Sequence, residues 1–322
     1  MKVLITGGAG FIGSHLAREL VRKHNEVHVI DNLSTGSIGN IEDLMANKCL
    51  HFHMDTILNK KLMRTLIKKV DCIYHLAAAV GVKYIIDNPL ESIKINVTGT
   101  EIVLGLANEL GKKKVILAST SEVYGKNMSR KTSFKETDDR LMGPTTISRW
   151  SYACTKALDE FLALAYYREK KLPVVIIRFF NICGPVQTGR YGMVIPRFVK
   201  NALSDRPITV YGDGNQTRSF THVKDAISAI LRLANDKKCV GDIFNLGNPH
   251  AISINTLAQK IKKMTGSRSV ITHISYEKAY EKGFEDMRHR RPDISKLRKA
   301  IDFRPAYSID DILRDVIDYF RV

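Results

Sequence analysis

A glycine-rich segment close to the N-terminus constrains the fold more than any other feature of this chain. Residues 6–13 read T-G-G-A-G-F-I-G, with glycine at positions 7, 10 and 13, between a short apolar run and a helical pattern. Glycine permits a tight strand-to-helix turn and lets the backbone approach a pyrophosphate closely. The N-terminus of the following helix offers free N–H groups to the phosphates. The segment therefore predicts a βαβ unit that binds a dinucleotide.

An acidic residue at the end of the next expected strand narrows the choice of dinucleotide. Asp31 lies about 20 residues after the glycines, where the dinucleotide pattern places an acid. A carboxylate there accepts hydrogen bonds from both ribose hydroxyls and repels a 2′-phosphate, so we expect NAD rather than NADP as the cofactor. The contacts expected around this turn and strand end are Gly7, Gly10, Phe11, Ile12, Gly13, Asp31 and Asn32.

The order of the apolar segments predicts the fold class. Strands are expected at residues 3–6, 26–30, 50–53, 72–76, 114–118 and 174–179, and the helices between them include 12–23, 90–110 and 152–169. This alternation indicates an α/β fold with a Rossmann-type doubly wound parallel sheet. Gly184-Pro185 marks the change to a smaller C-terminal α/β lobe with a strand at 208–211 and helices at 254–264 and 310–319. We predict an NAD-binding domain at 1–180, to which a strand near 242–247 returns, and a substrate-binding lobe at 181–322.

The overall composition argues against several classes of protein. The formal net charge of +17 is spread along the chain and does not gather in a basic helix, so we attribute it to solvated charge and an anionic substrate rather than to nucleic acid. No apolar run approaches the roughly 20 residues that span a bilayer. The five cysteines are scattered and form no C-x-x-C pair, which indicates neither disulfides nor zinc ligands. We expect a cytoplasmic protein whose reaction needs no metal.

Tyr152 and Lys156 form a candidate catalytic pair. They are four residues apart on an expected helix, so their side chains project from one face. Removal of a hydride from a carbinol carbon needs a base for the hydroxyl proton, but free tyrosine has a pKa of about 10. A neighbouring lysine ammonium and a positively charged nicotinamide both favour the phenolate and so lower that pKa. We therefore expect Tyr152 to act as the base and Lys156 to support it.

The segment that ends the fifth strand carries a more specific pattern. Residues 118–125 read A-S-T-S-E-V-Y-G. Together with the glycine spacing and the Tyr-x-x-x-Lys pair, they resemble the extended short-chain dehydrogenase/reductase superfamily, in particular its nucleotide-sugar epimerases, dehydratases and decarboxylases. The resemblance implies an enzyme with tightly held NAD that oxidises and re-reduces a UDP-sugar through a 4-keto intermediate. It also implies that Thr120 bridges to the substrate oxygen, with Ser119, Ser121 and Tyr124 as alternatives.

The resemblance extends over nearly the whole chain and implies further binding residues. A second acid, Asp55, is placed to hydrogen-bond the adenine, and small residues at 77–79 let the backbone lie against the cofactor. The other implied cofactor contacts are Thr56, Leu76, Ala77, Ala78, Ser119, Tyr152, Lys156 and Ile182. The implied substrate contacts are Lys83, Tyr84, Ser121, Asn181, Val194, Arg197, Tyr211, Arg218 and Arg290.

Two features bear on the type of reaction. Dehydratases of this group place an Asp-Glu pair after the catalytic threonine, whereas this chain has Ser121-Glu122, so dehydration is disfavoured. Thr-Ser-Glu, the R-W-S-Y sequence at 149–152 and residues 282–294 resemble UDP-glucuronate decarboxylases, which implies catalytic roles for Glu122 and Arg290. We predict decarboxylation of UDP-glucuronate. A 4-epimerase acting on UDP-glucose, UDP-GlcNAc or UDP-glucuronate is the alternative, and a non-catalytic NAD-binding protein is a minor third.

The helix expected at 152–169 bears on assembly. One apolar stripe at helical spacing, which we expect to face the sheet, comprises Leu158, Phe161, Leu162 and Ala165. A second stripe, which needs another partner, comprises Ala153, Ala157 and Leu164. Relatives in the superfamily pair this helix with the one at 90–110 in a four-helix dimer interface, so the resemblance implies a homodimer.

Overall fold

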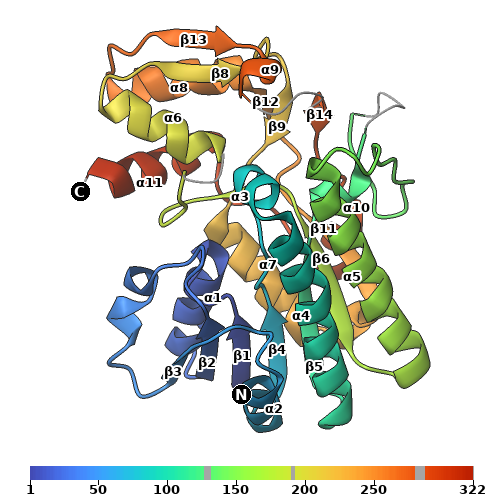
Figure 1. The fold of residues 1–322 in the computed structure, drawn as a ribbon. Coiled ribbons are helices and arrows are strands. Elements are labelled where there is room, and N and C mark those ends of the chain that lie inside the picture. Colours follow the sequence, from blue (N-terminus) through green and yellow to red (C-terminus); the bar gives the residue numbers. More distant parts are fainter. Residues whose placement is uncertain (127–131, 190–192, 280–286, 322) are drawn as a thin grey trace.

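A twisted parallel sheet forms the centre of the larger lobe (Figure 1). The computed structural model describes residues 1–126, 132–189, 193–279 and 287–321, without the side chains of residues 82, 83, 149, 277 and 279. Within these residues the sheet has seven strands in the order β11-β6-β5-β4-β1-β2-β3. Their bounds are β1 Lys2–Thr6, β2 Glu26–Asp31, β3 Leu50–Met54, β4 Cys72–His75, β5 Lys114–Thr120, β6 Val174–Phe179 and β11 Asp242–Leu246. Every pairing is parallel, which confirms the predicted doubly wound fold.

Helices cover both faces of this sheet, and each face has its own apolar core. On β1, Val3 and Ile5 point into one core while Leu4 points into the other, as the two-residue period of a strand requires. The first core is closed by α1 (Phe11–Arg22), α7 (Val223–Asn235) and α10 (Ser295–Ile301). The second is closed by α2 (Lys60–Lys69), α4 (Pro89–Glu109) and α5 (Arg149–Lys170). A short helix, α3 (Val82–Asp87), leads into α4.

The smaller lobe lies over the carboxyl ends of the strands and has a third apolar core (Figure 1). Strand β8 (Ile208–Tyr211) pairs in parallel with β13 (Ile271–Ile274). Helices α6 (Val194–Leu203) and α8 (Ile254–Thr265) pack against this pair, and α11 (Ile309–Arg321) packs on these two helices. Strand β9 (Thr217–Ser219) lies between β12 (Ala251–Ser253) and β14 (His289–Arg290). The remaining short elements are β7 (Ile182–Cys183), β10 (Thr221–His222) and α9 (Tyr276–Ala279). None of the described helices is both long and apolar enough to cross a membrane.

The chain crosses between the lobes more than once. Strand β11 returns to the sheet beside β6, as the sequence predicts for a strand near 242–247. Helices α7 and α10 also lie beyond residue 180 and bury their apolar sides in the first core of the larger lobe. The boundary at residue 180 stays a prediction, and the larger lobe receives these two helices in addition to the returning strand.

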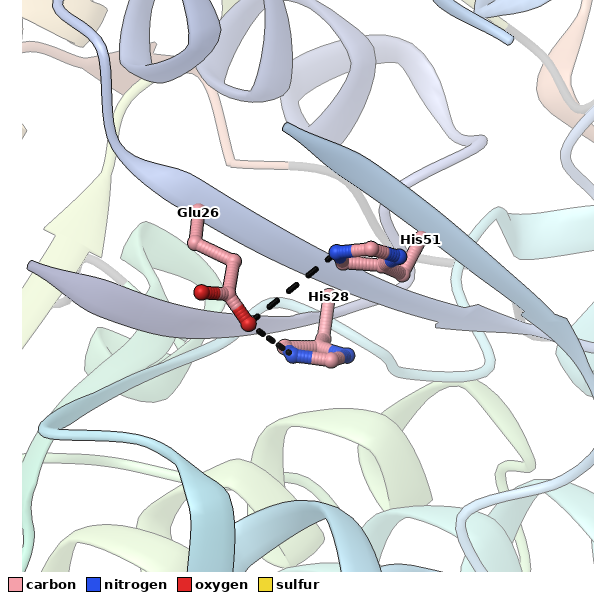
Figure 2. Close-up of side chains that lie close together, drawn as sticks. All are labelled: Glu26, His28 and His51. Carbon is pink, nitrogen blue, oxygen red and sulfur yellow. Dashed lines mark hydrogen bonds and ion pairs between the residues drawn. The ribbon is translucent and has the colours of Figure 1, made fainter. Parts of the chain in front are cut away.

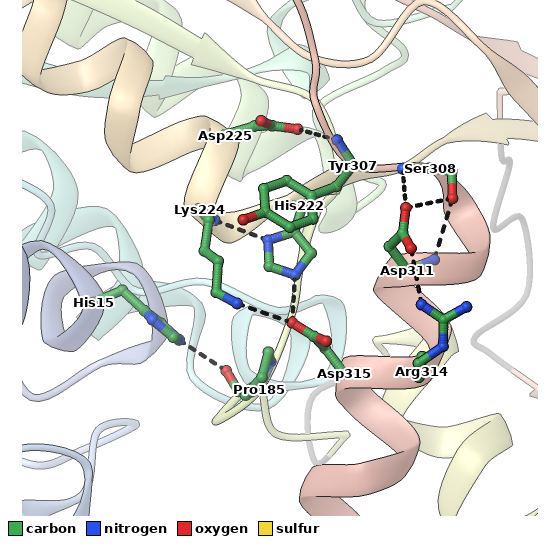
Figure 3. A network of polar contacts seen from close by, with 10 residues as sticks. All are labelled: His15, Pro185, His222, Lys224, Asp225, Tyr307, Ser308, Asp311, Arg314 and Asp315. Carbon is green, nitrogen blue, oxygen red and sulfur yellow. Dashed lines mark hydrogen bonds and ion pairs between the residues drawn. The ribbon is translucent and has the colours of Figure 1, made fainter.

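A polar network fixes α11 to the larger lobe (Figure 3). The carboxylate of Asp225, on α7, accepts hydrogen bonds from the backbone N–H of Ala306 at 3.1 Å and of Tyr307 at 3.3 Å. His222, directly before α7, stacks on Tyr307 with ring centroids 4.2 Å apart, and its Nε2 lies 3.1 Å from Asp315 Oδ2 on α11. These contacts hold the two lobes in one arrangement above the strand ends.

The orientation of α5 corrects the expectation from helical periodicity. Leu158 and Phe161 were expected to face the sheet, but they are 50% and 60% exposed. The side of α5 that faces the sheet carries Lys156, Asp159 and Glu160 instead, and all three are buried. Because these three charged residues share the buried side with apolar residues such as Ala163, the apolar stripe alone does not identify that side. The exposed pair therefore belongs to the face that is open to a partner.

Candidate active site

A cavity of about 520 Å³ lies where the two lobes meet above the carboxyl ends of β1, β2, β4 and β5. Parallel α/β sheets bind their ligands at this edge. Every residue that the sequence predicts for the site lines this cavity except Lys83, whose side chain lies outside the described part of the chain. The structure thus brings the predicted residues together, and their individual roles remain predictions.

The glycine turn is shaped for a closely approaching ligand. Gly7 has a φ of +72°, and a Cβ there would lie 2.9 Å from the backbone of Ala77 at the end of β4. At Gly13 a Cβ would lie 2.2 Å from the carbonyl oxygen of Gly7. Side chains at either position would push the turn away from the sheet or from α1. The turn keeps its backbone open toward the cavity, as a dinucleotide pyrophosphate requires.

Asp31 ends β2 at the edge of the cavity. Its Oδ2 accepts a hydrogen bond from the backbone N–H of Ala9 at 3.0 Å, and its Oδ1 accepts one from Leu33 at 2.8 Å. Burial raises the pKa of this carboxyl, and the hydrogen bonds oppose that shift. The two contacts fix both oxygens, and each oxygen retains a lone pair for a ribose hydroxyl. The arrangement fits the expected preference for NAD.

Thr120 and Tyr152 meet at the centre of the cavity. Thr120 ends β5, Tyr152 lies in the first turn of α5, and a hydrogen bond joins their side chains. The alternatives to Thr120 have other partners: Ser119 bonds to Glu160, and Tyr124 is fully buried and bonds to Asn245 at 2.7 Å. The third alternative, Ser121, also lines the cavity. Of these candidate hydroxyls, Thr120 is the one bonded to Tyr152.

The electrostatic surroundings of Tyr152 differ from the expectation. Burial raises the pKa of the phenol, the negative charge of Glu122 raises it further, and the Thr120 hydrogen bond opposes both. Lys156 was expected to lower this pKa, but its Nζ donates to Asp159 Oδ2 at 2.9 Å, and both side chains are at most 2% exposed. The protein alone therefore favours the neutral phenol. A positively charged nicotinamide would favour the phenolate.

Glu122 and Arg290 form an ion pair beside this tyrosine. Arg290 Nη1 donates to Glu122 Oε1, and its Nη2 donates to Asn181 Oδ1 at 2.8 Å. The two partners are far apart in the sequence, on the 3₁₀ turn after β5 and on β14. Arg290 Nε is buried and has no hydrogen-bond partner among the described residues. The pair places an acid and an arginine with a spare donor next to Tyr152 and Thr120.

The far end of the cavity offers an aromatic ring and further arginines. The guanidinium of Arg197, on α6, lies 4.0 Å from the ring centroid of Tyr211, at the end of β8. Its Nε is likewise buried without a partner among the described residues. Arg218, on β9, is buried and lines the same end. Guanidinium groups bind phosphates with a fixed fork of donors, so this end fits an anionic nucleotide.

Comparisons with known proteins identify the family. Residues 4–316 match the GDP-mannose 4,6 dehydratase family. The chain belongs to this family. It is 46% identical over 321 residues to a UDP-N-acetyl-alpha-D-glucosaminuronate decarboxylase of Bacillus cytotoxicus, covering 99% of this chain and 98% of that protein. It is 35% identical over 330 residues to UDP-glucuronic acid decarboxylase 1 of Xenopus tropicalis, covering 99% and 72%. The crystal structure of UDP-glucuronic acid 4-epimerase from Bacillus cereus, in complex with UDP-glucuronic acid and NAD, superimposes with a TM-score of 0.89 at 30% identity, covering 100% and 99%.

These findings confirm the general conclusions from the sequence. The chain is an NAD-dependent enzyme of the family that modifies nucleotide sugars, with the predicted cofactor and fold. The relatives named above divide between decarboxylases and a 4-epimerase. Family membership alone therefore does not distinguish decarboxylation from epimerisation, and the side chains of the cavity have to be considered.

A buried ion pair under the active site was missed by sequence reasoning. Arg178 donates to both carboxylate oxygens of Glu160, at 2.8 and 2.7 Å, and to the hydroxyl of Tyr124 at 2.9 Å. The network ties β6 and α5 to the turn that carries Glu122. One signal was available, since Arg178 is a charge inside the apolar strand V-V-I-I-R-F.

Other lining residues carry no recognisable pattern in the sequence. They gain their position only when loops distant in the chain meet at the cavity. The polar ones among them are Ser34, Thr35, Gln187, Thr188, Gln216 and Tyr276.

Proposed function

We propose that this enzyme decarboxylates a UDP-hexuronate through a C4 ketone, with UDP-N-acetylglucosaminuronate as its preferred substrate and UDP-glucuronate as the next. The Glu122–Arg290 ion pair beside Tyr152 and Thr120 carries this proposal, because a carboxylate substrate needs an arginine donor close to the reacting carbons. The two decarboxylase relatives support the same reaction, and the higher identity to the one named for the N-acetylated sugar supports that substrate.

Oxidation at C4 is the first step. When bound, NAD accepts a hydride from C4 and later returns one. Tyr152 takes the proton of the 4-hydroxyl, and Thr120, bonded to the same phenol, holds the substrate oxygen in line. Lys156 lines the cavity beside them, with its ammonium paired to Asp159. The resulting ketone lies β to the C5 carboxylate.

Loss of CO₂ is the second step. The C5–carboxylate bond breaks, its electron pair delocalises into the ketone as an enolate, and a proton then adds to C5. The negative charge of Glu122 near the substrate carboxylate raises the free energy of that carboxylate relative to neutral CO₂ and so favours loss of CO₂. The guanidinium of Arg290 orients the substrate or the water that delivers the proton. Tyr152 then returns its proton to the C4 oxygen as the ketone is reduced.

Epimerisation at C4 is the second candidate. The likeness to the UDP-glucuronic acid 4-epimerase structure favours it, and the pair of Tyr152 and Thr120 serves that reaction equally well. An epimerase needs room for the 4-keto ring to turn over, and it has no need for Glu122 and Arg290 to act on a carboxylate.

Product analysis decides between the two. The enzyme is incubated with UDP-N-acetylglucosaminuronate, UDP-glucuronate and UDP-glucose, and the products are followed by ¹H NMR together with released CO₂. We expect CO₂ and a UDP-pentose from the acids, fastest from the N-acetylated one. Glu122→Gln and Arg290→Ala should fail after the oxidation step. Arg288→Ala is the matched control, because that arginine pairs with Asp213 on the surface. Formation of the C4 epimer without CO₂ establishes the epimerase instead.

We also propose that the enzyme is a homodimer in the cytoplasm. Leu158 and Phe161 on α5 are exposed, as are Leu90 (80%) and Ile93 (42%) on α4, and the two helices pack against each other. A second copy that placed its own α4 and α5 here would cover these side chains. All five cysteines are free thiols, which agrees with a reducing compartment.

A further inference from the structure

A cluster of histidines with one carboxylate lies at the edge of the sheet, outside the active-site cavity (Figure 2). His28 on β2 is paired in register with His51 on β3, the edge strand, and Glu26 precedes His28 by two residues and so projects from the same face. Glu26 Oε1 lies 3.3 Å from His28 Nε2 and 4.0 Å from His51 Nε2. One ligand atom from each of the three residues lies within 4.8 Å of the others.

We propose that Glu26, His28 and His51 bind one Zn²⁺ ion. Zinc binds imidazole nitrogen and carboxylate oxygen at about 2.0–2.2 Å, so the ligand atoms of a tetrahedral site lie roughly 3.2–3.6 Å apart. The Glu26–His28 separation of 3.3 Å already meets this requirement. The rings of His28 and His51 stack with their centroids 4.7 Å apart at 26°, so the exposed His51 ring has to rotate to direct its Nε2, which lies 4.0 Å from Glu26 Oε1, at the same ion. Three protein ligands leave a fourth position for water.

Neighbouring side chains hold two of the three ligands in place. The Nδ1 of His28 lies 3.3 Å from Nε2 of His53, a second imidazole that can orient the ring. Lys2 holds the other carboxylate oxygen of Glu26 at 2.9 Å and leaves Oε1 facing the histidines. This is the arrangement of outer contacts that metal-binding histidines and carboxylates have.

The site would serve the structure of the cofactor-binding half. None of its three ligands lines the active-site cavity, so the ion would take no part in the reaction. It would instead join edge strand β3 to β2. Asp31 at the end of β2 and Asp55 just beyond β3 line the cavity, but the pairing of the two strands already holds these acids in register without the ion.

Zinc titration of the whole, untagged enzyme tests the proposal. Protein stripped with a chelator and dialysed is titrated with ZnCl₂ alone by calorimetry. We expect one ion per chain and a rise in melting temperature. His51→Ala and Glu26→Gln should each weaken binding at least tenfold. His53→Ala, which removes only the outer contact, should weaken it about tenfold or more, as loss of such contacts does elsewhere.

Two controls keep the result interpretable. His24→Asn removes an exposed histidine outside the cluster and should bind zinc as the wild type does. The zinc-free variants should keep their enzymatic activity, which shows that they fold and separates this site from the proposed reaction. Absence of stoichiometric binding at 100 μM zinc, or equal binding by wild type and both ligand variants, overturns the proposal. A crystal soaked in zinc should show anomalous density between Glu26 and His51, and density elsewhere alone would also overturn it.

Discussion

His75 makes the stability of this enzyme depend on pH in a way that can be calculated. It ends β4 and is fully buried, with Nδ1 2.8 Å from Thr6 Oγ1 and Nε2 3.1 Å from Thr100 Oγ1. Burial, and to a lesser extent the charge of Lys156, lowers its pKa to about 3. The folded protein therefore keeps this ring neutral at every pH at which the enzyme is handled.

The sign and size follow from linkage. In the unfolded chain the same histidine has a pKa of about 6.5, so below that pH the unfolded state binds a proton that the folded state refuses. Stability is unaffected well above pH 6.5 and falls as the pH drops. Between pH 7 and pH 5 the loss from this residue is about 2 kcal/mol, since each pH unit below 6.5 approaches 1.4 kcal/mol. His15, His28, His53 and His222 also have lowered pKa values and add to the loss.

Urea unfolding isolates the contribution of His75. Wild type and His75→Asn are unfolded at pH 7 and at pH 5, and the change in unfolding free energy is compared between them. The variant is expected to have a lower unfolding free energy at pH 7, because it loses one bridging contact. Between pH 7 and pH 5, however, its unfolding free energy should fall by about 2 kcal/mol less than that of the wild type. Because each protein is compared with itself at the two pH values, the pH-independent effect of the substitution on stability cancels. If both proteins lose the same free energy, the residue is not held neutral and the reasoning is wrong.

Three further predictions concern the cofactor, the base and the assembly. Tyr152→Phe should lower turnover by about 10²–10⁴-fold with NAD binding retained by calorimetry, and near-normal turnover would exclude this tyrosine as the base. Wild type should bind NAD more tightly than NADP and Asp31→Ala should narrow the preference, whereas tighter NADP binding by the wild type would contradict the role of Asp31. Light scattering at micromolar concentration should show a dimer for wild type and a monomer for Phe161→Asp, and a monomeric wild type would refute the interface.

The sequence predicted most of the fold because its regular elements are strongly patterned. The strand expected at 174–179 is β6 with the same bounds, and the strand at 208–211 is β8. The returning strand near 242–247 lies beside β6, although nothing local marks its partner. Its prediction came from the residues of the segment itself, whereas the substrate contacts on α6, β8, β9 and β14 rested on family resemblance. The helices α7 and α10 were not assigned to the larger lobe, because an amphipathic pattern shows that a face is buried and not against what.

Electrostatic detail around the site was the part that sequence could not supply. The spacing of Tyr152 and Lys156 correctly placed both at the cavity, but it did not show that Asp159 holds the lysine. Asp159 also shows why the apolar stripe on α5 did not predict which side of the helix faces the sheet. Charged residues occupy part of that side. The spacing of residues in a sequence indicates which side chains share a face of a helix. The pKa of a side chain depends on every charge that folding brings close to it.

Asp159 therefore offers a direct test of how the base is controlled. It is bonded to Lys156, and its negative charge raises the pKa of Tyr152. Asp159→Asn keeps the shape of the side chain, removes that charge and leaves the lysine ammonium without its anionic partner. Both changes lower the pKa of Tyr152, so the phenolate forms more readily and the rising limb of the pH–rate profile should move to lower pH. Glu169→Gln, an exposed acid on the same helix, should leave the limb unchanged. A limb that stays in place while the melting temperature falls would show that Asp159 only stabilises the fold. A limb that moves to higher pH would show that the pairing of Lys156 with Asp159 favours the phenolate, and would overturn this reasoning.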